Sequence, residues 1–79
     1  MTRYYFDLRD GDDLMPDDEG LELASSHSAQ EEAALSLADL AKDAIRSRRI
    51  DGQGGLLAVE VRDDKGPVLQ ARFTVHVRS

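Results

Sequence analysis

The sequence predicts an α+β domain of two layers, β-β-α-β-β, in which one helix packs on one face of an antiparallel four-stranded sheet. The segment 69–77 alternates apolar and polar residues without a break. This pattern is typical of a strand with one face on a core and the other face in water. The segment 29–48 is rich in alanine and leucine at helical spacing. A length of 79 residues favours a single domain, 1–79.

Two strands are expected before the helix. In the first, Arg3–Arg9, the alternation directs Tyr4, Phe6 and Leu8 to the core. A turn at Asp10–Asp13 and an acidic loop reaching Glu19 should follow. The segment Gly20–Ala24 then predicts a short second strand, whose two leucines, Leu21 and Leu23, point inward.

The helix is expected from about Ala29 to Arg48. Ser28 and Glu31 match the capping-box pattern, in which each side chain satisfies the backbone N–H of the other residue. Leu35 falls on the side of the helix opposite to its apolar stripe. It is interpreted either as an exposed leucine without a function or as a residue that contacts a partner. The stripe that should face the sheet consists of Ala33, Ala34, Leu37, Leu40, Ala41, Ala44 and Ile45.

Two further strands should follow the glycine-rich connection Asp51–Gly55. The third strand is expected over Leu56–Arg62 and the hairpin turn over Asp63–Gly66. The inward residues of these two strands should be Leu57, Val59, Val61, Leu69, Ala71, Phe73, Val75 and Val77.

Composition restricts the classes of partner. The net charge is −6, with a balance of −8 over residues 1–32 and +2 over residues 33–79. This acidity argues against binding to nucleic acid or to an anionic membrane, both of which require clustered cations. The uneven distribution permits reciprocal contact between two copies of the chain. The sequence has no cysteine and no apolar signal segment, so a cytoplasmic protein is expected.

No motif for catalysis, a cofactor or a metal is present, and the sequence therefore predicts a protein that is not an enzyme. His76 would need a carboxylate such as Glu60 to act as a general base, and a surface histidine is the simpler interpretation. The densest set of oxygen ligands does not match the order of a calcium loop, which favours a solvated loop over a divalent-ion site. That set is Asp10, Asp12, Asp13, Asp17, Asp18 and Glu19.

The outward face of the sheet is the surface that we expect to bind a protein, because tyrosine and arginine are enriched at interfaces. The sequence thus predicts an interaction or regulatory domain that docks through this face or a strand edge and forms a homodimer. An alternative is an acidic regulatory partner that masks a basic protein. The expected contact residues are Tyr5, Arg62, Arg72, Thr74 and His76.

Three segments carry a resemblance to known proteins. They are Arg3-Tyr4-Tyr5-Phe6-Asp7-Leu8-Arg9-Asp10-Gly11, then Asp17-Asp18-Glu19-Gly20-Leu21-Glu22-Leu23, and the turn Asp63-Asp64-Lys65-Gly66. Together they resemble a family of short uncharacterised proteins of soil and plant-associated alphaproteobacteria, a domain of unknown function. A weaker likeness is to HicB-like antitoxin domains, whose helix starts like Ser28–Ala33. That likeness implies an antitoxin-like regulatory role.

Overall fold

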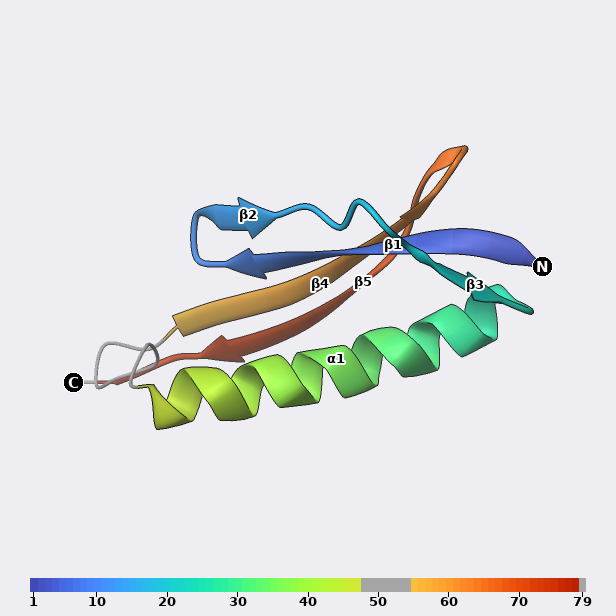
Figure 1. Cartoon of the computed structure of the whole chain (residues 1–79). Helices are drawn as coiled ribbons and strands as arrows, with labels where there is room; N and C mark the ends of the chain where they lie inside the picture. The colour runs from blue at the N-terminus through green and yellow to red at the C-terminus, as the bar shows by residue number, and fades with distance from the viewer. Residues whose placement is uncertain (48–54, 79) are drawn as a thin grey trace.

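The structure, a computed structural model, describes residues 1–47 and 55–78. Its strands form an antiparallel sheet in the order β2-β1-β4-β5, with β3 also paired to β1, and one helix packs against the sheet (Figure 1). The predicted α+β class is therefore confirmed, with five strands instead of four. The elements are β1 (Thr2–Asp10), β2 (Asp13–Met15), β3 (Leu21–Leu23), α1 (Ser26–Arg46), β4 (Gly55–Asp63) and β5 (Gly66–Val75).

The fifth strand, β2, lies inside the segment that we expected to be an acidic loop. Gly11 adopts a φ of +60°, which glycine accepts without strain, and the chain reverses directly after β1. Asp13–Met15 then pairs with the end of β1, with Met15 opposite Leu8. The residues of this strand, Asp13-Leu14-Met15, do not alternate between apolar and polar and all three are exposed, which explains why the pattern did not indicate it.

The core lies between α1 and the two strands β4 and β5. The inward residues of β4 are fully buried, as predicted: Leu57, Val59 and Val61. Alanines form the buried stripe of α1, which allows the helix to approach the sheet closely. These alanines are Ala29, Ala33, Ala41 and Ala44.

The predicted capping box is wrong. The helix begins at Ser26, and its N-cap is Ser25, whose Oγ accepts the backbone N–H of Ser28 at 3.2 Å. Several serines in sequence compete for this role, and Ser25, two residues after the end of β3, has the extended backbone that is typical of an N-cap. Glu31 instead pairs with His27, at 2.9 Å between Oε1 and Nε2.

Four residues that we expected in the core are exposed. Leu21, Ile45 and Val77 have exposed fractions of 43%, 56% and 52%, and Ala34 is exposed as well. Val77 is exposed because β5 ends at Val75, opposite the first residue of β4. The others lie at the margins of the two layers.

The remaining sequence predictions have mixed outcomes. The alternation of β5 is confirmed from Leu69 to Val75, where half-buried and exposed residues alternate. The predicted end of the helix at Arg48 and most of the connection, 51–54, lie outside the described residues. No helix in the described part of the chain has the length and apolar character that a membrane span requires.

Candidate interaction surface

Asp17 closes one edge of the sheet where no strand does. Strand β1 pairs with β3 up to Tyr4 and with β2 from Leu8 onward. Between these two ladders, the backbone N–H of Phe6 donates to Oδ2 of Asp17 at 3.1 Å. A carboxylate thus takes the place of a strand carbonyl at this edge.

The second oxygen of Asp17 holds the turn that leads into β3. Oδ1 accepts the backbone N–H groups of Glu19 and Gly20, at 3.1 and 3.2 Å. Burial raises the pKa of Asp17, but these three backbone N–H groups and the charge of Arg62 outweigh it, and the pKa is lowered. The carboxylate therefore works in its ionised form as a structural acceptor.

Gly20 allows the segment before β3 to pass close to β1. Its φ is +75°, in the region that favours glycine. A Cβ at this position would lie 2.8 Å from Cγ of Arg3 and 3.0 Å from both the carbonyl oxygen of Tyr4 and Cε1 of Tyr5. The spacing of Asp17 and Gly20, which carries part of the family resemblance, is thus a device for positioning β3.

The outward face beside Asp17 is held by Arg62. Its Nε donates to Oδ2 of Asp7 at 2.9 Å, and its Nη2 donates to the backbone carbonyl of Asp17 at 2.9 Å. The guanidinium also stacks on Tyr5, with Cζ at 4.4 Å from the ring centroid. Two of the predicted contact residues, Tyr5 and Arg62, are therefore brought together, but in contact with each other.

A second polar cluster lies further along the same face. Nε of Arg9 donates to Oε2 of Glu60 at 2.8 Å, and Gln70 donates to the same oxygen at 3.1 Å. The hydrogen bond from Arg9 is the main reason that the pKa of Glu60 is lowered. Glu60 lies opposite Gln70, six residues before His76, so the structure does not bring Glu60 and His76 together.

The acidic residues from Asp10 to Glu19 do not converge. Asp10 and Asp13 lie opposite each other at the turn between β1 and β2, whereas Asp17 faces the backbone of β1 and β3. Asp12, Asp18 and Glu19 are exposed. Over residues 1–47 and 55–78, no group of three or more histidine, aspartate and glutamate side chains is placed to hold a metal ion.

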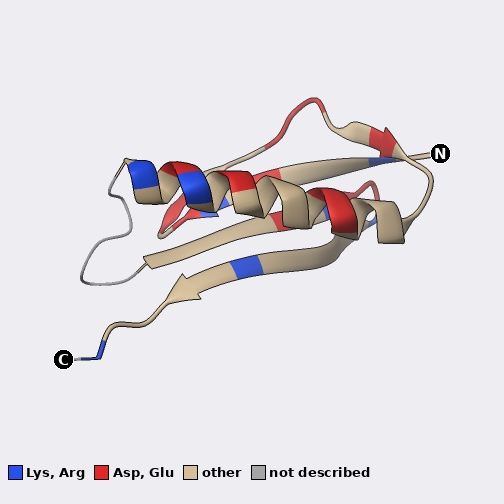
Figure 2. Ribbon diagram, turned by 90° about the horizontal axis from the view of Figure 1, so that it is seen from below, with Lys and Arg blue, Asp and Glu red and all other residues tan. Residues whose placement is uncertain are grey.

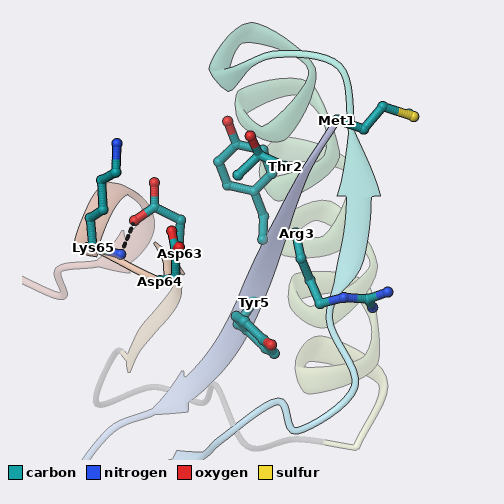
Figure 3. A pocket seen from close by; sticks show the side chains of 8 residues that line it. Met1, Thr2, Arg3, Tyr5, Asp63, Asp64 and Lys65 are labelled. Atoms are coloured by element: carbon teal, nitrogen blue, oxygen red, sulfur yellow. Dashed lines mark hydrogen bonds between the residues drawn. The ribbon is translucent and has the colours of Figure 1, made fainter.

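A cleft of about 410 Å³ opens where β1 separates from the hairpin between β4 and β5 (Figure 3). Pairing between β1 and β4 ends at Tyr5 and Arg62, so the first residues of β1 have no partner in β4. The rim carries both signs of charge, and Oδ1 of Asp63 accepts the backbone N–H of Lys65 at 2.8 Å. The cleft is lined by Met1, Thr2, Arg3, Tyr4, Tyr5, Asp63, Asp64 and Lys65.

Strand β5 forms the other edge of the sheet. It pairs with β4 on one side, and on its other side no strand of the described chain covers it. Arg72 and Thr74 are exposed on β5 and His76 is exposed just after it. Arg72 is the one charged residue of β5, and Figure 2 shows this strand with a single blue segment.

An apolar flank of α1 runs beside this edge. Successive helical residues rotate by about 100°, so with Ala44 facing the sheet, Ile45 falls on the side of β5. Ala34 and Ala38 share this side and are exposed like Ile45. We call Ala34, Ala38 and Ile45 the helix flank. Sequence analysis missed it because a helical projection does not reveal how far the sheet extends on either side.

A family model described as a domain of unknown function, DUF6894, matches residues 3–74. The chain belongs to this family. No curated protein matches the chain, and no solved structure does. The DUF6894 match includes Asp17, Gly20 and Arg62, so the residues that close and brace the edge of β1 lie within the family domain. The alphaproteobacterial origin and the likeness to HicB stay predictions.

Proposed function

We propose that this DUF6894 domain is a non-enzymatic interaction module that binds another protein chain through the free edge of β5. One observation carries the proposal: β5 is an edge strand of ten residues with an exposed apolar helix flank beside it. Unpaired N–H and C=O groups on such an edge can receive a strand from a second chain. The composition without cysteine suits the cytoplasm as its place of action.

The contrast between the two edges supports the proposal. The edge of β1 that faces away from β4 is covered by β2, by β3 and by the carboxylate of Asp17. At the start of β5, two features hinder pairing with another strand. Pro67 has no backbone N–H, and an irregularity leaves Val68 without a partner in β4. The rest, 69–75, carries no such protection.

The side chains beside this edge define the contact surface. Arg72 and Thr74 point outward from β5, and His76 follows the strand. No ion pair or hydrogen bond involves the Arg72 side chain among the described residues, so its guanidinium is available to a partner. Tyr5 and Arg62 contact each other, and Arg62 also binds Asp7. These two residues therefore stabilise the sheet and do not themselves form part of the contact surface.

Affinity capture with matched baits tests this proposal. The wild-type domain, Ala38→Glu and Leu35→Glu are each used to capture proteins from a lysate of cells that naturally contain the chain. Both substitutions add a carboxylate at an exposed helical position, but Leu35 lies away from β5. We expect Ala38→Glu to lose a partner that the other two baits retain. Identical partners on all three baits would contradict docking at this edge.

A further inference from the structure

We infer that the chain which pairs with β5 is a second copy of this protein, and that the two β5 strands run antiparallel about a two-fold axis at Phe73. This inference rests on the proposed docking at the β5 edge and adds the identity of the partner. It would join the two sheets into one continuous sheet, with both helices on the same face. Three observations carry it.

The first observation is the position of α1 over the sheet. The helix packs against both β4 and β5 and so lies over that pair of strands. Strands lie about 4.8 Å apart, which places the helix axis roughly 2.4 Å inside β5. Pairing β5 with its symmetry mate then separates the two helix axes by about 10 Å, close to the 8–10 Å at which packed helices lie.

The second observation is the composition of the helix flank. The axes of two helices can approach within about 10 Å where the side chains between them are small. Ala38 meets this requirement, and Ile45 supplies apolar area at the end of the flank, whereas Ala34 lies further from Phe73, toward the start of the helix. Because this flank is exposed in one copy, a second copy would bury apolar surface from both helices at once.

The third observation is electrostatic. Two chains that each carry a net charge of −6 repel one another over most of their surfaces. Strand β5 contains no acidic residue, and the helix flank carries no charge. By helical rotation the acidic residues Glu32, Asp39 and Asp43 lie on the parts of α1 turned away from the helix flank, and Glu31, which lies seven residues before Ala38 on the same side, pairs with His27. The β5 edge is therefore a surface where like-charged copies can meet.

The pattern of β5 selects the register. An axis at Arg72 would place two guanidinium groups opposite each other, and directly opposed like charges destabilise a sheet. An axis at Phe73 places Arg72 opposite Thr74 of the partner subunit and pairs two aromatic rings on the helix side. Phe73 packs at the level of Ala41 and Ala44, so this axis places the contact between the helices at the part of the flank from Ala38 to Ile45.

The first test is the oligomeric state of the purified protein by sedimentation velocity from low to high micromolar concentration. We expect a dimer for the wild type and for Leu35→Glu. We expect the dissociation constant to be at least about 10-fold higher for Ala38→Glu, since each added carboxylate would lie in the apolar contact beside Ile45 of the partner subunit. Circular dichroism is used to verify that both variants are folded. A wild-type monomer throughout this range would overturn the inference.

The second test uses a single cysteine in a chain that otherwise has none. With the axis at Phe73, the Cα atoms of the two Thr74 residues lie roughly 8 Å apart, from the strand spacing and a two-residue offset. A short bismaleimide should therefore link Thr74→Cys into a covalent dimer, and Leu35→Cys on the far side of α1 should stay monomeric. Equal linking of both variants, or of neither, would overturn this arrangement.

The two proposals fail in different ways. A purified wild type that stays monomeric removes the second copy as the partner. Loss of a captured protein by Ala38→Glu alone would still support docking of another protein at the β5 edge. If the wild type is monomeric and all baits capture the same proteins, both proposals fail.

Discussion

The carboxylate of Asp17 accepts the backbone N–H of Phe6 at 3.1 Å, eleven residues away along the chain and between two short ladders of strand pairing. This one contact joins β2 and β3 into a continuous edge along β1. The opposite edge of the sheet, on β5, has no comparable cover among the described residues. The domain thus closes one edge with a side chain, and we propose that it offers the other to a partner.

Replacement of Asp17 by asparagine should destabilise the domain. Asparagine has one acceptor oxygen and an NH₂ group, so it cannot accept from Phe6, Glu19 and Gly20 together. Hydrogen bonds to charged groups contribute about 1.5–3 kcal/mol, and we expect a loss near the lower end because Asp17 is partly exposed. Urea unfolding measures the change in the free energy of unfolding. Asp18→Asn is the control, because Asp18 is exposed and lies next to Asp17 in the sequence. An equal loss in both variants would contradict this role.

Acid should weaken the fold through the same carboxylate. The pKa of Asp17 is lowered in the folded state, so its contribution to stability is complete above the unfolded value, about 3.9, and is lost as the pH falls through the lower folded value. The pKa of Glu60 is also lowered in the folded state, so protonation of Glu60 reduces the stability in the same direction. Unfolding free energies measured between about pH 6 and pH 2 should decline more steeply in the wild type than in Asp17→Asn. Parallel curves would show that Asp17 does not couple folding to protons.

Replacement of Arg62 by lysine keeps the charge but should lower stability. Lysine cannot donate along two directions to Asp7 and to the Asp17 carbonyl while stacking flat on Tyr5. We expect a loss of about 1–2 kcal/mol in the free energy of unfolding. Arg72→Lys provides the control, because no described contact depends on the shape of the Arg72 side chain. A thermal shift of similar size in both variants would argue against the bracing role of Arg62.

The regular parts of this fold were predictable from the sequence, because alternation reports burial directly. Leu57, Val59 and Val61 are buried as their spacing predicts, and β5 alternates from Leu69 to Val75. The start of the helix was not predictable by pattern, since Ser25 and Ser28 both suit an N-cap and the position of β3 decides between them.

The residues that organise the candidate surface were harder to predict, because their roles depend on contacts distant in sequence. Asp17 gains its role from a gap between two ladders on β1, and no local pattern around it indicates that gap. Arg62 was expected to contact a partner, but the β1–β4 register places it opposite Tyr5, where it stacks within the domain. The helix flank became visible only once the order of the strands was known.

Replacement of Gly20 by alanine should disrupt the positioning of β3. Gly20 and Gly11 both have positive φ, at +75° and +60°, so an added Cβ strains either backbone by about 1–2 kcal/mol. At Gly20 the new methyl group would also lie 3.0 Å from the carbonyl oxygen of Tyr4, which is fixed by the β1–β3 ladder, whereas nothing lies within 4 Å at Gly11. We therefore expect Gly20→Ala to lose at least about 1 kcal/mol more than Gly11→Ala in urea unfolding. Amide exchange should localise the damage: faster exchange in Leu21–Leu23 is expected for Gly20→Ala alone. Equal losses in the two variants would mean that only backbone strain matters and that close packing at Gly20 does not position β3.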